Sequence, residues 1–327
     1  MKITIATPKR PSSGSGNDVT STRWAKRLTE LGHEVTVAMV IEGRDVTVDV
    51  AIGSDVLVAL HAKRCGSAVA ASRDHAPERP VVVGLAGTDL YSDLPANNLV
   101  ARASIETADR LVVLQEAAVD RLADINLSLA EKAHVVFQSV DPPILARRIN
   151  QDHFVVLVLA HLRDVKDPLL AAEAARLLPE DSRIRVVHGG HASNDEWHKR
   201  ATSENASNPR YEWLGELDNN SAKTQLSQAS ALACTSLLEG GANVVSEAIA
   251  LGVPVVGTDI DGNSGLLGSG YPGLVPVGDA AALARWLLRL ENEPALLNDL
   301  TDRIGERRVI TDPATEREGW QAVLDGL

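Results

Sequence analysis

Residues 238–259 read LEGGANVVSEAIALGVPVVGTD and contain a loop, a helix and a strand in direct succession. Two glycines precede an apolar run, and the glycine of GVP (252–254) is a common helix stop before a Val-rich strand. We expect a helix that starts near Ala242, with Glu239 in the loop before it and Glu247 inside it. Unpaired N–H groups at such a helix start favour an anion, and glycine lets the backbone approach a ligand closely.

This stretch suits a ligand with phosphates in the middle and hydroxyl groups at both ends, which describes a sugar nucleotide. The carboxylate pair can act as a general acid and base, or it can bind hydroxyl groups. Read alone, Glu247 is an ordinary charge on a helix surface, so the hypothesis depends on the Gly-Gly-Ala-Asn sequence between the carboxylates. The candidate donor-binding residues in this stretch are Glu239, Gly240, Gly241, Ala242, Asn243 and Glu247.

The same succession of strand, loop and helix recurs along the whole chain. The apolar runs show little alternation, which is typical of parallel strands buried on both faces by helices. Right-handed crossovers connect such strands. The expected strands are residues 2–7, 32–40, 55–60, 80–87, 109–114, 134–140, 153–160, 183–190, 211–215, 230–236, 253–258 and 273–278. The expected helices include residues 19–31, 61–73, 98–107, 115–123, 168–178 and 280–290, and residues 88–95 are expected to form a loop.

We therefore predict an α/β protein with two Rossmann-like, doubly wound domains facing a central cleft. Its length of 327 residues suits two domains better than one core. The sequence DPP at residues 141–143 and a polar linker separate a first domain of residues 1–147 from a second of residues 148–310. Residues 311–327 are amphipathic, and by analogy we expect them to form a helix that packs back on the first domain.

Composition excludes several classes of function. The formal net charge of −12 argues against broad binding to nucleic acid or to anionic membranes, which requires a positive surface. No apolar run approaches the roughly 18 residues of a membrane helix, and no signal peptide is expected before the first strand. Cys65 and Cys234 stand outside any CxxC or Cys/His cluster, so neither a metal site nor another cofactor is expected. We expect a cytoplasmic protein with small-molecule substrates.

Further candidates lie in the loops that follow strands, because ligands of open α/β sheets bind beyond the carboxyl ends of the strands. The Gly/Ser-rich loop after the first strand can hold a phosphate, but it lacks the GxGxxG of a nicotinamide dinucleotide site. LHAKR (60–64) places a histidine beside two cations, and GTD (87–89) follows the next strand. The candidate acceptor-binding residues are Lys9, Arg10, Asn17, Arg23, His61, Lys63, Arg64, Thr88 and Asp89, with Gly16 a candidate for the donor. A structural histidine, a salt bridge at Arg23 and an N-cap at Asp89 are the alternatives.

The loop AHLRDVKDP (160–168) follows the first strand of the second domain and carries two fixed cations. Arg163 offers a planar fork to a phosphate and Lys166 a point charge. Together they would stabilise a departing diphosphate. The alternative is a solvated, charged loop.

Glu239 and Glu247 match the E-x7-E motif of the retaining glycosyltransferases of family 4, which have the two-Rossmann fold called GT-B. The resemblance includes His61 at a strand end, the 160–168 loop and GVPVVGTD. It implies that Glu239 contacts the donor sugar, that Glu247 contacts the nucleotide ribose, and that Arg163 and Lys166 hold the diphosphate without a metal. Its implied catalytic residues are His61, Glu239 and Lys166.

A narrower resemblance rests on longer runs in both predicted domains. These are TPKRPSSGSGNDVTSTRWAKRL, VALHAKRC, GLAGTDLYSDLP, DRLVVLQ, FQSVDPP, LAHLRDVKDP, NPRYEWLGEL and LEGGANVVSEAIALGVPVVGTDI. Together they are similar to the selenosugar synthases of selenoneine biosynthesis. This resemblance implies transfer of the sugar of a UDP-sugar, chiefly UDP-N-acetylglucosamine, to selenophosphate, with release of UDP and phosphate. It also implies a functional link to selenophosphate synthetase.

The sequence departs from the general family at two places. Ala160-His161 stands where many members have Gly-Arg, and Gln138-Ser139 stands where they usually have Asn-Gly. Both departures fit a subgroup with its own acceptor. Selenophosphate is small and multiply anionic, so it would need cations in the first domain, and the candidates are Lys9, Arg10, Arg23, Lys63 and Arg64. The alternatives are a family 4 transferase with a sugar or small-molecule acceptor, a UDP-sugar epimerase, and a non-catalytic UDP-sugar-binding module.

Overall fold

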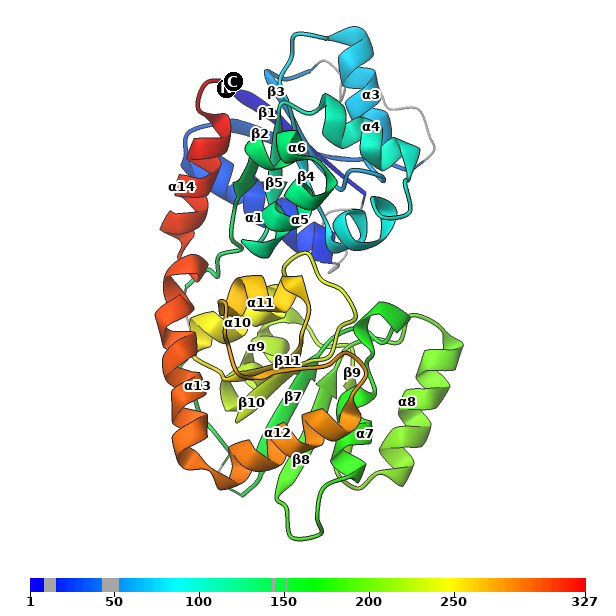
Figure 1. The fold of residues 1–327 in the computed structure, drawn as a ribbon, viewed down its shortest axis with the longest axis vertical. Helices are drawn as coiled ribbons and strands as arrows, with labels where there is room; N and C mark the ends of the chain where they lie inside the picture. Colours follow the sequence, from blue (N-terminus) through cyan, green and yellow to red (C-terminus); the bar gives the residue numbers. More distant parts are fainter. Residues whose placement is uncertain (9–15, 43–52, 143–144, 151) are drawn as a thin grey trace. The chain divides into compact units, whose positions relative to one another are not determined.

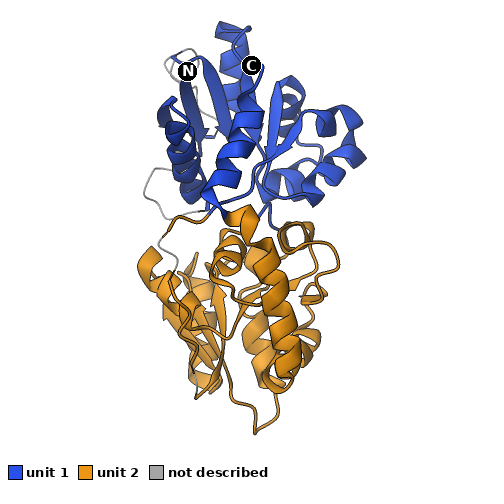
Figure 2. Cartoon of the chain, turned by 90° about the vertical axis from the view of Figure 1, so that its left-hand side faces the viewer, with its two compact units in different colours: residues 1–139, 239–241, 312–327 blue, residues 140–238, 242–311 orange. Residues whose placement is uncertain are grey.

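The computed structural model describes residues 1–8, 16–42, 53–142, 145–150 and 152–327. Two compact units divide the chain (Figure 2). Unit 1 consists of residues 1–139, 239–241 and 312–327, and unit 2 of residues 140–238 and 242–311. The change of unit falls after Ser139, ahead of the predicted boundary at residue 147, and the C-terminal residues 312–327 count with unit 1.

Unit 1 is built on a parallel sheet with the strand order β2-β1-β3-β4-β5-β6 (Figure 1). Its strands are β1 (Lys2–Thr7), β2 (Glu34–Met39), β3 (Val56–Leu60), β4 (Val81–Gly84), β5 (Arg110–Val113) and β6 (Ala133–Val135). The order reverses between β1 and β3, and ligands of doubly wound sheets bind at such a reversal. The carboxyl ends of β1, β3 and β4 are therefore the places in unit 1 to look for a site.

The apolar runs of unit 1 fill two cores, one on each face of its sheet. Val58 belongs to the cluster that contains Trp24 and Trp320, whereas Leu57 belongs to a second cluster that contains Ile105. Successive side chains of a strand point to opposite faces, so a strand covered on both faces needs apolar residues at every position. This explains why β3 is buried along its whole length.

The helices of unit 1 are α1 (Gly16–Glu30), α3 (Gly66–His75), α4 (Leu99–Thr107), α5 (Ala117–Ile125), α6 (Leu127–Glu131) and α14 (Pro313–Leu324). Three predictions were wrong in detail. The helix expected from residue 61 begins only at Gly66, the loop expected at 88–95 contains a π-helical turn, η1 (Asp89–Asp93), and the strand expected at 134–140 ends at Val135.

Helix α14 packs on α1 through an aromatic pair and a buried ion cluster (Figure 1). The rings of Trp24 and Trp320 meet edge to face with centroids 4.9 Å apart. Glu316, which is fully buried, pairs with Arg27 at 3.3 Å and with Arg23 at 3.1 Å. Such a cluster is stable only while every charge keeps its partner. The C-terminal segment is therefore an integral part of unit 1.

Unit 2 contains a second parallel sheet, with the order β12-β11-β10-β7-β8-β9. Its strands are β7 (Phe154–Leu159), β8 (Ile184–Gly189), β9 (Tyr211–Gly215), β10 (Ala231–Cys234), β11 (Val255–Thr258) and β12 (Leu274–Val275). Its helices are α7 (Leu170–Arg176), α8 (Asp195–Ser207), α9 (Asn219–Gln228), α10 (Asn243–Leu251), α11 (Asp261–Leu267), α12 (Ala280–Asn292) and α13 (Pro294–Glu306). This is the strand order of a Rossmann sheet, with its reversal between β7 and β10.

The predicted architecture of two Rossmann-like, doubly wound sheets is confirmed. Within the described part of the chain, no helix combines the length and the hydropathy needed to cross a bilayer. Cys65 and Cys234 are both buried, and no disulfide joins them.

Candidate active site

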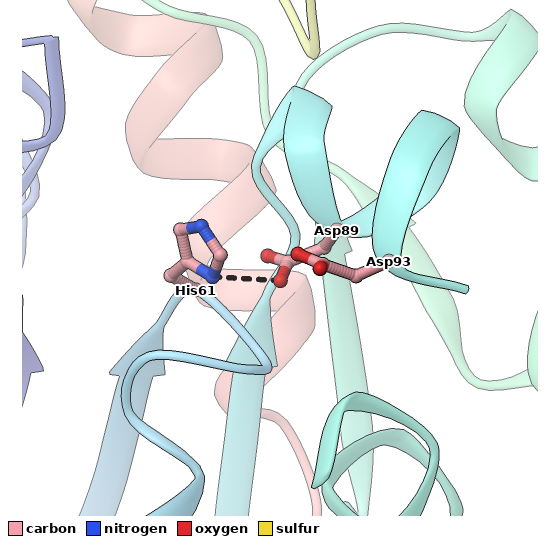
Figure 3. Close-up of side chains that lie close together, drawn as sticks. All are labelled: His61, Asp89 and Asp93. Atoms are coloured by element: carbon pink, nitrogen blue, oxygen red, sulfur yellow. Dashed lines mark ion pairs between the residues drawn. The ribbon is translucent and has the colours of Figure 1, made fainter. Parts of the chain in front are cut away.

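In unit 1, the ends of β3 and β4 bring His61 and Asp89 together (Figure 3). Thr88 lies within hydrogen-bond distance of His61. The His61 Nδ1 atom lies 2.7 Å from Asp89 Oδ1, and its Nε2 atom lies 2.9 Å from Thr88 Oγ1. His61 is 1% exposed and Asp89 is fully buried, whereas Thr88 is half-buried. The three side chains thus form a row that begins in the interior and ends at the surface of the unit.

Asp89 is the centre of this cluster. Besides His61, its carboxylate accepts hydrogen bonds from the backbone N–H groups of Ala62 at 2.9 Å, Lys63 at 3.1 Å and Ala86 at 3.0 Å. The first two of these bonds satisfy N–H groups in the turn that connects β3 to α3. They also hold His61 at a φ of +90°, which a non-glycine residue adopts only when its surroundings enforce it.

This geometry changes the role predicted for Asp89. Both of its oxygens face protein donors and its side chain is closed to solvent. We therefore assign Asp89 to holding His61 and the loop after β3, and no longer to direct acceptor binding. The N-cap alternative also fails, because Asp89 lies inside the turn that it was expected to precede.

The cations predicted to bind the acceptor have different surroundings. Lys63 Nζ pairs with Asp93 Oδ1 at 3.0 Å, and this hydrogen bond raises the pKa of the lysine. Arg23 is engaged by Glu316, which is the salt-bridge alternative considered from the sequence. Arg64 is half-buried beside His61.

The other predicted residues of unit 1 lie at or before the start of α1. Gly16 and Asn17 form its first turn, whereas Lys9 and Arg10 lie outside the described residues.

His61, Asp89 and Asp93 also satisfy the spacing of a metal site, with one ligand atom of each within 4.8 Å of the others. A metal ion there would compete with the ammonium group of Lys63 for Asp93 and with three backbone N–H groups for Asp89. Oxygen ligands of a divalent cation have to be free of such donors. We therefore interpret the cluster as a hydrogen-bonded network.

The segment 239–241 of the E-x7-E motif also belongs to unit 1. A Cβ atom on Gly87 would lie 2.5 Å from the backbone N of Gly240, and one on Gly240 would lie 2.7 Å from the N of Gly87. Glycine is therefore needed on both sides of this contact. Gln138 Nε2 donates to the carbonyl oxygen of Gly241 at 3.0 Å. In the sequence, Gln138 is recognisable only as a departure from a family pattern, and its hydrogen bond to Gly241 was not predicted.

The rest of the motif follows the sequence prediction closely. Helix α10 begins at Asn243 after the N-cap residue Ala242, and it ends at Gly252 with a φ of +71°. The N-cap side chain makes no capping hydrogen bond, as expected for alanine. The expected helix start and stop are confirmed. Glu239 lies in the loop and Glu247 inside the helix, and both are half-buried.

In unit 2, the loop after β7 presents the predicted cations at the reversal of strand order. Arg163 is exposed, and Lys166 ends a short 3-10 turn, η2 (Asp164–Lys166). Asp167 follows in the left-handed region with a φ of +40°.

This loop is tied to the chain after β10. The hydroxyl group of Thr235 lies 3.0 Å from the carbonyl oxygens of both Lys166 and Asp167, and Leu237 N donates to Val165 O at 2.9 Å. Thr235 is a residue that sequence reasoning missed, because nothing in its local pattern indicates a contact with a loop some 70 positions away.

The side chain of His188 contacts the first residue of the same loop. His188, fully buried, contacts Tyr211 Oη with Nδ1 and Ala160 O with Nε2, both at 2.9 Å. Burial lowers its pKa to about 4, so the imidazole is neutral at pH 7.

His161 stacks on His191 with ring centroids 3.8 Å apart. Burial, followed by the proximity of His191 and Arg163, lowers the pKa of His161 to about 4 as well. At pH 7 the positive charge of this loop therefore comes from its arginine and lysine.

Two doubly wound parallel sheets, with polar and cationic groups beyond their strand ends, define the GT-B class of fold. Residues 145–307 match the family model described as "Glycosyl transferases group 1". The match covers the whole of the loop after β7 and the E-x7-E motif. The family match and the fold together support a glycosyltransferase.

Several solved glycosyltransferases share the fold. HepE from Anabaena, solved with UDP and glucose, is 16% identical, matches over 100% of both chains and has a TM-score of 0.78. A sucrose-phosphate synthase from Thermosynechococcus elongatus is 15% identical over 98% of both chains, also with a TM-score of 0.78. TarM from S. aureus, solved with UDP, is 18% identical with a TM-score of 0.66, and the match covers 83% of this chain.

The chain spans only 55% of the length of TarM. At these identities the likeness establishes the fold and not the substrate. No curated protein matches the sequence significantly.

Proposed function

We propose that the protein is a glycosyltransferase with a UDP-sugar as donor. The observation that carries this proposal is the loop after β7, which places Arg163 and Lys166 at the strand-order reversal of a sheet whose residues match the family. HepE, with the same fold, was solved with UDP-glucose, which supports the choice of donor. Arg163 and Lys166 would bind the diphosphate and stabilise the additional negative charge that it gains when the bond to the sugar breaks.

The motif residues complete the donor site in this proposal. Glu247 would bind hydroxyl groups of the ribose and Glu239 those of the sugar. The N-terminal N–H groups of α10 follow a glycine pair, and backbone N–H groups at a helix start attract phosphate oxygens.

We further propose that the acceptor is selenophosphate, so that the protein is a selenosugar synthase using UDP-N-acetylglucosamine. Selenium attacks the anomeric carbon, the bond from that carbon to the diphosphate oxygen breaks, and UDP leaves with the electron pair. Water then cleaves the P–Se bond and releases phosphate. The sequence runs quoted above support this acceptor. An anionic selenium needs no protein base for its attack.

Incubation of the protein with selenophosphate and UDP-N-acetylglucosamine tests the proposal. We expect a selenosugar by mass spectrometry and UDP in equal amount. Glu239→Gln and Lys166→Ala should each lower turnover. The free energy of unfolding, measured for each variant, shows that the loss is not a loss of folding. Product formation that persists unchanged in both variants would remove the site assignment, and absence of product with any UDP-sugar would remove the selenosugar activity.

One observation favours a second candidate, a transferase that acts on a sugar or another small alcohol. Lys63 and Arg23, two of the cations expected to bind an anionic acceptor, are paired with Asp93 and Glu316. An uncharged acceptor would not require them. UDP release that ignores selenophosphate but rises with added sugars would support this candidate, and conversion of the donor without any acceptor would indicate an epimerase.

A further inference from the structure

The cluster of His61, Thr88 and Asp89 has an inner and an outer end. Asp89 and His61 are buried, with 0% and 1% of their surfaces exposed. Thr88 is the only one of these three residues that is partly exposed. A substrate that approaches the carboxyl edge of β4 therefore meets the threonine hydroxyl before it can reach the imidazole.

The hydrogen bonds fix how the imidazole faces Thr88. Nδ1 lies 2.7 Å from a carboxylate oxygen, so it carries a proton and donates to Asp89. The backbone N–H of Arg64 is also near Nδ1, but at 3.4 Å this contact is much weaker than the one with the carboxylate. Nε2 is left to face Thr88 Oγ1 at 2.9 Å.

This arrangement links the state of His61 to the hydrogen bonding of Thr88. When Nε2 carries no proton, the Thr88 hydroxyl donates to it and offers only lone pairs to a ligand. When Nε2 is protonated, it donates to Thr88 Oγ1, and the threonine proton is free to point at a ligand. In both states the atom that a ligand meets is the threonine oxygen.

The position of Thr88 in unit 1 fits contact with a substrate. It follows Gly87, whose backbone is in van der Waals contact with Gly240 of the E-x7-E motif. It also lies beyond the carboxyl end of β4, on the edge of the sheet where ligands of this class of fold bind. The buried His61, itself held by Asp89, contacts the Thr88 hydroxyl.

We propose that Thr88 is the residue of this cluster that binds the acceptor substrate, and that His61 is a positioning residue that acts through the Thr88 hydroxyl. The proposal rests on the glycosyltransferase function put forward above. It differs from the sequence-based hypothesis, in which His61 contacts the substrate itself.

Three variants test it by steady-state UDP release. Thr88→Val keeps the shape and removes the hydroxyl, Thr88→Ser keeps the hydroxyl, and His61→Asn is chosen because asparagine tolerates a positive φ better than most residues. We expect Thr88→Val to lower kcat/KM for the acceptor about tenfold or more, the size of a lost hydrogen bond at a reacting group, with the KM for the UDP-sugar within about twofold. Thr88→Ser should recover most of the loss.

The double variant His61→Asn/Thr88→Val decides whether His61 acts through the threonine. If it does, adding His61→Asn to Thr88→Val changes kcat/KM by less than about twofold, because residues that act as one unit are not additive. Two independent, multiplying losses would show that His61 touches the substrate and would overturn the proposal. Should His61→Asn fail to fold, the Thr88 pair decides alone, since equal activity of Thr88→Val and wild type overturns it.

The outcome is separable from that of the proposed function. A wild-type protein that releases no UDP with any acceptor contradicts the glycosyltransferase itself. A wild-type protein that turns over while Thr88→Val does so equally well contradicts only the role of Thr88. Binding of UDP by each variant, measured by calorimetry, shows that the donor site is intact in both cases.

Discussion

The two units present polar residues in the same place, beyond the carboxyl ends of parallel strands, but in opposite ways. In unit 1 the ends of β3 and β4 turn their polar groups inward, where Asp89 satisfies three backbone N–H groups and His61. In unit 2 the loop after β7 is fixed through its backbone by Thr235, and it turns Arg163 outward. The cluster in unit 1 consists of groups that hydrogen-bond to one another. The loop in unit 2 is held through its backbone, and its Arg163 side chain is exposed.

Because of this difference, we expect substitutions in unit 1 to change the stability of the protein and substitutions in the unit 2 loop to change ligand binding. Removing a member of the buried network leaves other groups without partners, so the loss appears in the free energy of unfolding. Removing a cation from the loop after β7 leaves no buried backbone donor without an acceptor, so the main loss appears in binding and turnover. The following experiments test that distinction, from the largest expected effect to the smallest.

Asp89→Ala should be the most damaging of the substitutions. It leaves three backbone donors and the Nδ1 of a buried imidazole without the carboxylate, and we expect a loss of about 3 kcal/mol in the free energy of unfolding. Denaturant titration followed by circular dichroism measures it. Asp93→Ala is the matched control, because its partly exposed pair with Lys63 is screened by solvent and should contribute much less. Equal losses in the two variants would contradict the central role of Asp89.

Lys166→Ala should show the opposite behaviour. We expect kcat/KM for the UDP-sugar to fall about 100-fold, as for removal of one group that stabilises a charged leaving group. The free energy of unfolding should change by less than about 0.5 kcal/mol. Lys199→Ala, an exposed lysine on α8, is the control and should change neither quantity. A stability loss with normal turnover would place Lys166 in the structural framework instead.

His188 provides a pH-dependent test of unit 2. Its pKa is lowered to about 4 by burial, so the unfolded chain binds its proton first as the pH falls below about 6.5. The stability from its neutral form is complete above that pH and is lost as the pH falls toward 4, by roughly 3 kcal/mol at most.

Unfolding titrations at pH 7, 5.5 and 4.5 on wild type and His188→Gln measure this effect. The wild type should lose more stability on acidification than the variant does. Parallel pH curves for the two proteins would show that His188 is not the group responsible. His161 titrates in the same window and remains in both proteins, so it cancels in the difference.

Thr235→Val should have the smallest effect. It keeps the shape of the side chain and removes the hydroxyl that holds the carbonyl oxygens of Lys166 and Asp167. We expect UDP affinity to fall about fivefold, equivalent to about 1 kcal/mol for one hydrogen bond. Thr235→Ser should bind UDP like the wild type. If calorimetry gives the same affinity for all three proteins, the loop does not depend on this contact.

Local sequence patterns predicted much of the fold and part of the site. The apolar runs located the strands of both sheets, and Gly252 located the end of α10 with its positive φ. The same patterns failed at residues 61–65 and 88–95. A helix was expected from His61, but this residue has a φ of +90°, outside the helical region, and the helix begins only at Gly66. The contacts of His61 and of the N–H groups of Ala62 and Lys63 with Asp89, 28 positions after His61, are not visible in the local pattern.

The sequence by itself determined which segments are buried strands and where helices can begin and end, because these depend on side-chain patterns within a few residues. It also placed Arg163, Lys166 and Glu239 in loops, and Glu247 in the helix that follows its loop. Only the tertiary structure decided which polar groups have a hydrogen-bond or ion-pair partner elsewhere in the protein. The buried Asp89, the Arg23–Glu316 pair and the Thr235 contact join residues far apart in the chain. Burial and partner choice are properties of such long-range contacts, so no local pattern carries them.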